Sequence, residues 1–111
     1  MIASKLVETL VEENLQDWTF CVEKLVDMLH ISPTCLRELT RKYFNQTPHQ
    51  YIESRRLQKA LLLLPLPKHL YEVCKLVGYN CVPSFRRAFT LTFGMTPSEH
   101  RTKVLARTDK N

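Results

Sequence analysis

The sequence lacks the signals of a membrane protein, a secreted protein or a β-structured domain. Its longest apolar run, residues 60–66, is too short to span a bilayer, and the N-terminus has no basic region followed by an apolar segment. No segment alternates apolar and polar residues around turn dipeptides such as Asn-Gly. Because 44% of the 111 residues are hydrophobic, the chain can still bury a core. We therefore expect a soluble, cytoplasmic, all-α protein.

Residues that carry metal or catalytic chemistry are few and unsuitably spaced. No CxxC spacing and no flanking histidines at zinc-finger spacing occur among the four cysteines, Cys21, Cys35, Cys74 and Cys81. Free thiols are the simplest interpretation, although a turn could bring Cys74 and Cys81 together for a redox or metal role. Ser84 has no nearby base or acid to activate it, and no carboxylate pair has catalytic spacing. We expect neither an enzyme nor a cofactor nor a bound metal.

Acidic residues become scarce after the N-terminal quarter. Residues 1–29 contain two lysines and six acidic side chains, whereas residues 30–111 contain fourteen basic and five acidic side chains. This asymmetry is typical of a domain that binds a polyanion, but a solvated basic face without a partner has the same composition. Charge alone leaves both interpretations open.

Signals for helix starts, by contrast, are abundant. A capping hydroxyl precedes a proline at 32–33, 47–48 and 96–97, and proline suits the first helical position. Thr47 with Gln50, and Thr96 with Glu99, complete capping boxes. Together with apolar residues at helical spacing, these signals predict about seven helices: 3–14, 22–29, 33–44, 48–64, 70–77, 83–93 and 97–105.

The chain also repeats itself at an offset of 48 to 49 residues. The apolar positions of 22–29 recur in 70–77, and those of 36–48 recur in 85–97. Each copy is a short helix, a tight turn and a second helix. The two glycines, Gly78 and Gly94, fall at the turn and after the second helix, where left-handed backbone is favoured. His30 and Asn45 take these places in the first copy.

The second helix of such a unit packs by one face and offers the other to a DNA major groove. Helical spacing predicts two outward sets: Thr34, Arg37, Glu38 and Arg41 in the first copy, and Val82, Pro83, Arg86, Arg87 and Thr90 in the second. Arginine reads guanine well, and glutamate can accept from cytosine. Arginines at matching positions favour a DNA contact over a solvated face, while Glu38 has the alternative of pairing with Arg41 or Lys42.

The chain resembles the DNA-binding domain of AraC/XylS-type transcription regulators over roughly residues 5–103. The resemblance rests on "YIESRRLQKALLLL" (51–64), "VCKLVGY" (73–79), "SFRRAF" (84–89) and "FGMTPSEHR" (93–101). It implies a homeodomain-like, all-α fold with two helix-turn-helix subdomains joined by a long central helix. The expected parts are an N-terminal subdomain (1–47), a linker helix (48–64), a C-terminal subdomain (65–105) and a polar tail (106–111).

The resemblance also implies roles for individual residues. Base-edge contacts would come from Thr34, Arg37, Glu38, Val82, Pro83, Ser84 and Arg87. Phosphate contacts would come from Arg41, Lys42 and Arg86, and from the helix starts at Thr47 and Thr96. The chain departs from the family where Val26 and Cys74 replace small alanines, where Thr40 replaces a phenylalanine, and where Val82 and Pro83 replace polar residues. The last departure leaves thymine-methyl contact, reading by Arg87, or recognition of DNA shape open for the second subdomain.

The resemblance predicts sequence-specific binding of double-stranded DNA by a bacterial, nucleoid-associated regulator, most simply an activator. RNA polymerase is a second candidate partner, and no membrane partner is expected. The isolated domain would be monomeric, with a dimer if it belongs to a longer chain. Both a small stand-alone regulator and the C-terminal piece of a longer protein are open. The rival hypothesis is a helix-turn-helix-derived module that docks a protein and reads no DNA.

Overall fold

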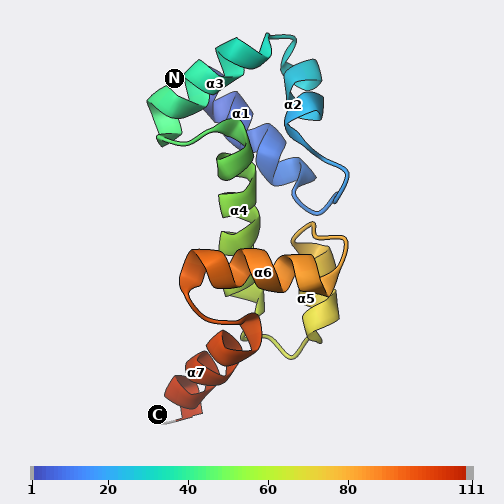
Figure 1. Ribbon diagram of the computed structural model, residues 1–111, viewed down its shortest axis with the longest axis vertical. Coiled ribbons are helices and arrows are strands. Elements are labelled where there is room, and N and C mark those ends of the chain that lie inside the picture. Colours follow the sequence, from blue (N-terminus) through green and yellow to red (C-terminus); the bar gives the residue numbers. More distant parts are fainter. Residues whose placement is uncertain (1, 110–111) are drawn as a thin grey trace. The chain divides into compact units, whose positions relative to one another are not determined.

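The computed structural model describes residues 2–109 (Figure 1). Within that range the chain forms seven α-helices and no strand, as the sequence predicts. The helices are α1 (Ile2–Asn14), α2 (Val22–Leu29), α3 (Pro33–Phe44), α4 (Pro48–Leu63), α5 (Leu70–Leu76), α6 (Val82–Phe93) and α7 (Pro97–Asp109). The chain divides into two compact units, Met1–Arg56 and Leu57–Asn111.

The observed boundaries differ from the expected ones by more than one residue at two places. The division after Arg56 falls inside the segment 48–64, because the first half of α4 packs into the core of one unit and the second half into the core of the other. α7 continues to Asp109, four residues beyond the predicted end, since no proline or glycine interrupts 106–109. Residues 110–111 of the expected tail lie outside the described residues.

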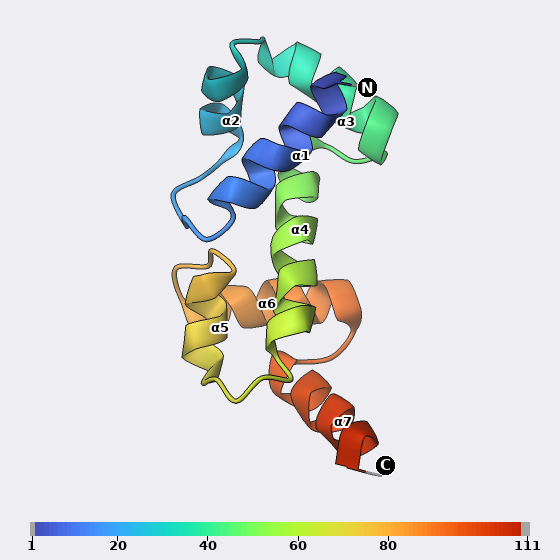
Figure 2. The same cartoon turned by 180° about the vertical axis from the view of Figure 1, so that it is seen from behind.

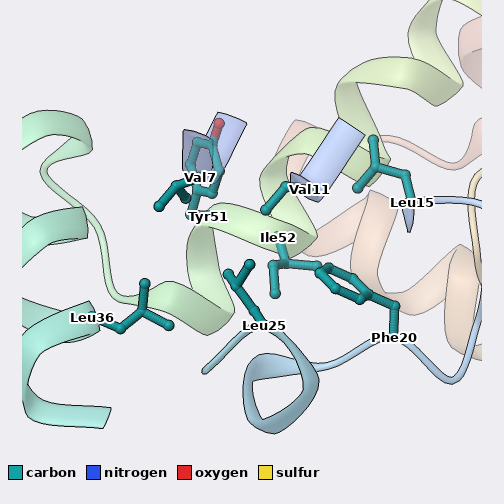
Figure 3. Close-up of a cluster of buried hydrophobic side chains, with 8 residues drawn as sticks. All are labelled: Val7, Val11, Leu15, Phe20, Leu25, Leu36, Tyr51 and Ile52. Carbon is teal, nitrogen blue, oxygen red and sulfur yellow. The ribbon is translucent and has the colours of Figure 1, made fainter. Parts of the chain in front are cut away.

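The core of the first unit is built on a stripe of α1. Val7 and Val11 are four residues apart and therefore lie on one face of that helix, and Leu15 follows directly after its last residue. This stripe forms a cluster with Phe20, Leu25, Leu36, Tyr51 and Ile52 (Figure 3). Burying one such aliphatic side chain contributes about 1.5–3 kcal/mol. The cluster thus connects α2 and α3, the two helices of the first helix-turn-helix, to α1 and α4.

The side chain of Arg56 secures the loop between α1 and α2. Its guanidinium donates hydrogen bonds to the backbone carbonyl oxygens of Leu15 at 3.2 Å, Asp17 at 3.0 Å and Phe20 at 3.1 Å. A guanidinium presents its donors in a fixed planar fork, which suits several carbonyls along one loop. The contact fixes the path of the chain into α2.

The second unit repeats this arrangement around aromatic rings. α5 and α6 lie beside the second half of α4 (Figure 2). Their cluster comprises Leu57, Ala60, Leu64, Val73, Cys74, Val77, Phe85 and Phe89. Phe89 meets Phe93 edge to face, with ring centroids 4.6 Å apart, and meets His100 of α7 at 5.8 Å. The Nε of Arg101 donates to the carbonyl oxygen of Leu64 at 2.6 Å, which joins α7 to the end of α4.

The four turn positions singled out in the sequence all have left-handed backbone. The φ angles are 56° at His30, 56° at Asn45, 93° at Gly78 and 77° at Gly94. Glycine adopts this conformation without strain, asparagine with little, and other residues at a cost. The two copies therefore use left-handed backbone at equivalent positions, although residues 30–32 join α2 to α3 and residues 77–81 join α5 to α6.

We predict that Gly94→Ala lowers the free energy of unfolding by about 1 kcal/mol, because alanine is strained at this positive φ. An added Cβ would meet no atom within 4 Å, so crowding does not contribute. Gly94→Asn, which copies the residue of the first unit, should cost clearly less. Urea denaturation of the two variants tests this; equal losses would contradict the role of φ.

Candidate nucleic-acid interface

The rotation of α3 is set by its buried residues. Ser32 caps the helix, since its Oγ accepts a hydrogen bond from the N–H of Cys35 at 3.0 Å. Leu36 and Thr40 are fully buried. Thr40 stands where the second copy has Phe89, and its hydroxyl donates to the carbonyl oxygen of Arg37 at 3.2 Å. The hydroxyl of this buried threonine thus has its hydrogen-bond partner within the helix itself.

The opposite face of α3 carries the predicted contact residues of the first unit. All five are exposed: Thr34, Arg37, Glu38, Arg41 and Lys42. The Nη2 of Arg37 donates to the hydroxyl of Thr34 at 3.1 Å, so these two base-reading candidates are already linked. No ion pair involving Glu38 occurs in the described part of the chain, so its pairing with Arg41 or Lys42 is absent. The Glu38 carboxylate remains available as an acceptor.

α6 presents a similar face, with a less polar start. Phe85 and Phe89 are fully buried, and the outward residues Pro83, Ser84, Arg86 and Arg87 are exposed. Val82 differs from the other candidates because it is half-buried and packs against the core of the second unit. Only part of its side chain faces solvent.

A thiol lies at the beginning of α6. Cys81 is the N-cap residue and is exposed, and its Sγ is 3.2 Å from the Oγ of Ser84. The hydroxyl and the backbone N–H of Ser84 stabilise the thiolate, and Lys75 and Arg87 add positive potential, so the pKa of Cys81 is lowered. Cys74 is buried, which raises the pKa of its thiol. Neither cysteine is in a disulfide.

The two capping boxes predicted at Thr47 and Thr96 are both present. The N–H of Thr47 donates to Gln50 Oε1 at 3.0 Å, and the N–H of Gln50 donates to Thr47 Oγ1 at 3.2 Å. Thr96 and Glu99 form the same pair of bonds at 2.8 and 3.1 Å. These bonds use N–H groups that we expected to be free for phosphate. Contacts from Thr47 and Thr96 stay predictions, with fewer available donors than the sequence suggested.

Two residues beside α6 were missing from the predicted site. Lys75 fixes the turn before the helix by donating from its Nζ to the carbonyl oxygen of Asn80 at 3.1 Å. Cys81 contacts Ser84, as described above. Both flank the turn marked by Gly78, and this closeness to a recognised turn is the signal that could have identified them.

The described residues form neither a metal-binding cluster nor a membrane-spanning helix. Among residues 2–109 no group of three histidine, cysteine, aspartate or glutamate side chains is arranged to hold a metal ion. None of the helices, as far as the structure describes them, combines the length and apolarity needed to cross a bilayer.

A family described as a helix-turn-helix domain matches residues 25–103. The chain belongs to the AraC-type helix-turn-helix family. This family comprises DNA-binding domains of transcription regulators and is not a family of enzymes. Membership confirms the expected fold class and the general function.

Two curated proteins illustrate how AraC-type domains occur in longer chains. The transcriptional activator RclR of Escherichia coli K12 is 31% identical over 102 residues, which are 89% of this chain and 34% of RclR. The probable transcriptional regulator LumQ of Photobacterium leiognathi is 29% identical over 97 residues, which are 86% of this chain and 39% of LumQ. The chain thus spans between a third and two fifths of these relatives.

Solved AraC-type domains have the same fold. The C-terminal domain of the two-component response regulator yesN from Fusobacterium nucleatum is 28% identical, with a TM-score of 0.85 over 91% of this chain and 99% of that domain. The DNA-binding domain of AdpA, solved in complex with a target DNA, is 23% identical, with a TM-score of 0.87 over 96% of each chain. The second likeness establishes the fold.

We predict that Ser84→Ala moves the pKa of Cys81 back toward the ordinary thiol value, because it removes the hydroxyl that stabilises the thiolate. The Cys81 thiolate fraction at neutral pH should fall, so alkylation by iodoacetamide should slow and its pH profile should shift upward. Peptide-resolved mass spectrometry gives the rate at this residue. Ser98→Ala, an exposed serine in α7, is the matched control; identical profiles in both variants would contradict the Ser84 contact.

Proposed function

We propose that this AraC-type domain reads double-stranded DNA with both units, placing α3 and α6 in major-groove segments about one helical turn, or 34 Å, apart. The observation that carries the proposal is the same in each unit: the second helix of the helix-turn-helix is buried on one face and exposes two arginines on the other. A single copy of the domain would then recognise a long, asymmetric site.

The proposed base contacts differ between the units. In the first, Arg37, held by Thr34, reads guanine, and Glu38 accepts from cytosine. In the second, Arg87 is the main reader. Ser84, Pro83 and the exposed part of Val82 contribute thymine-methyl or shape recognition. The hydrogen-bonding capacity of α3 supports a stricter base preference in the first unit.

The proposed phosphate contacts fix the register. Arg41 and Lys42 lie near the end of α3, and Arg86 lies on α6, all exposed. Such contacts carry little sequence information but supply much of the affinity, and they make binding depend on salt. The helix starts at Thr47 and Thr96 complete the set through those backbone N–H groups that the capping boxes do not engage.

The remaining functional assignments are based on the similar proteins described above. We propose a bacterial, nucleoid-associated cytoplasmic regulator that acts as an activator, because RclR is described as a transcriptional activator. RNA polymerase is the proposed second partner. The domain is proposed to be monomeric by itself and dimeric within a longer chain.

A second candidate function is supported by exposed apolar residues. On α6, Leu91 has 81% of its surface exposed, and Pro83 at the start of the helix is also exposed. A module that docks a protein partner through such residues would use the same scaffold without reading bases.

Selection from a randomised duplex pool at near-physiological salt tests the proposal. We expect two short motifs, about ten base pairs apart, in the bound fraction. Affinity for the selected duplex should fall steeply as salt rises, since counterions are released from the phosphates. Absence of any enriched motif, or binding insensitive to salt, would favour the docking module; one motif would show that a single unit reads bases.

We further predict that Arg37→Ala and Arg87→Ala each reduce discrimination between the selected duplex and a mismatched one by about 1–3 kcal/mol. Fluorescence anisotropy with the two duplexes measures this difference. Arg107→Ala removes an exposed arginine from α7, outside the proposed interface, and should leave discrimination intact. Preserved discrimination in the Arg37 and Arg87 variants would refute their role as base readers.

A further inference from the structure

The first unit contains a cavity lined by residues of three helices. Its volume is about 250 Å³, and α1, the end of α3 and the beginning of α4 surround it. The lining residues are Glu8, Glu12, Phe44, Tyr51 and Arg55. None of the residues proposed to touch DNA belongs to this set. A volume below that of a typical drug-sized site suits a group as small as one side chain.

The charges in this cavity do not balance. Glu12 is paired with Arg55, whose Nε lies 2.6 Å from Glu12 Oε1. Glu8, one helical turn earlier on α1, has no ion pair within the described residues. Lys5, the nearest lysine along α1, is exposed and does not pair with Glu8. Two carboxylates facing one guanidinium leave a single uncompensated negative charge.

Tyr51 adds a hydroxyl group to the lining of the cavity. Its side chain is only 6% exposed, and its hydroxyl forms no hydrogen bond with any residue from 2 to 109. Figure 3 shows that the hydroxyl points away from Leu25 and Ile52. Burial raises the pKa of Tyr51, Arg55 opposes the rise, and Glu8 and Glu12 add to it. The hydroxyl therefore keeps its proton at neutral pH. It is not among the fully buried atoms without a partner in the described residues, so it reaches the accessible part of the cavity, where a ligand or water can bond to it.

The cavity also has an aromatic side. The rings of Phe44 and Tyr51 are stacked, with centroids 4.2 Å apart and planes inclined by 16°. Aromatic rings attract organic cations and provide contact area for an aliphatic chain. An anion is disfavoured by the net negative charge. A metal ion is disfavoured because no cluster of three ligating side chains exists among the described residues.

We propose that this cavity binds one organic cation, a primary ammonium or guanidinium group carried on a short aliphatic chain. The Glu8 carboxylate and the Tyr51 hydroxyl accept its N–H groups, and the stacked rings contact the chain. The same chemistry is available from a free amine or from a lysine or arginine side chain of a protein partner. The site is independent of base reading, since it uses other residues of the first unit.

Titration of the full chain with butylammonium and butylguanidinium, followed by the aromatic NMR signals of Phe44 and Tyr51, tests the proposal. We expect saturable binding at one site for both cations and none for 1-butanol, a neutral molecule of similar size. Equal signal changes with the alcohol, or no saturation with either cation, would overturn the proposal.

Three variants connect such binding to the named residues. Glu8→Gln should weaken cation binding at least about tenfold, because it removes the uncompensated charge. Tyr51→Phe keeps the stacked rings and should weaken binding several-fold. Glu13→Gln makes the same charge change at an exposed position of α1 that does not line the cavity, and should change nothing. Thermal melting checks that each variant is folded; a loss shared by Glu8→Gln and Glu13→Gln would overturn the assignment.

Two further measurements distinguish a free amine from a protein side chain as the source of the cation, and cation binding from DNA binding. A lysine or arginine blocked at both backbone ends should bind more tightly than butylammonium if the site takes a protein side chain, and less tightly if it takes a free amine. Failure of both the blocked residues and the free amines to bind overturns the proposal. Glu8→Gln should retain the affinity of the parent for the selected duplex, so failure of the cation site and failure of DNA reading are distinguishable.

Discussion

Leu36 and Thr40 in α3, and Phe85 and Phe89 in α6, are fully buried pairs spaced four residues apart. Because an α-helix has 3.6 residues per turn, burying such a pair fixes the rotation of the helix about its own axis. The outward direction of Arg37 and Arg87 follows from that rotation. Every proposed base contact thus depends on apolar packing on the far side of the same helix, and only secondarily on the contact residue itself.

The recognition helices of the two units, α3 and α6, are fixed in the same way but bury and expose different side chains. The first buries a threonine, Thr40, where the second buries a phenylalanine, Phe89. Its α3 exposes Thr34, Arg37 and Glu38, which offer both donors and acceptors. α6 instead begins with a thiol and a proline and exposes arginines later. The same order of helices therefore supports one polar and one less polar surface.

Local signals predicted most of the fold. Capping boxes, Ser-Pro and Thr-Pro helix starts and the left-handed positions depend on residues within a few positions of one another, and the structure confirms them. The exposure of the arginines followed from helical periodicity in the same way. The length of α7 was underestimated because the polar residues 106–109 contain no apolar stripe to mark a helix, although nothing in them stops one.

The sequence did not predict contacts between residues that lie far apart along the chain. Glu8 and Tyr51 line one cavity although 42 residues separate them. The contacts of Arg56 with three loop carbonyls could not be predicted from the sequence either, because every residue has a backbone oxygen. The competition between capping side chains and phosphate for the same N–H groups, by contrast, follows from the capping boxes that the sequence predicts, and the structure shows which N–H groups they use. Base and phosphate roles themselves rest on family resemblance and exposure.

The Arg56 contact has a consequence for the order of folding. Its three hydrogen bonds span 36 to 41 positions along the chain, so they close a loop that contains α2 and α3, the whole of the first helix-turn-helix. The entropy of closing such a loop must be offset by contacts elsewhere before the guanidinium can find its carbonyls. The loop between α1 and α2 therefore gains these hydrogen bonds only once the first half of α4 lies against the core of the first unit. During synthesis, these hydrogen bonds can form only when the chain has extended at least to Arg56.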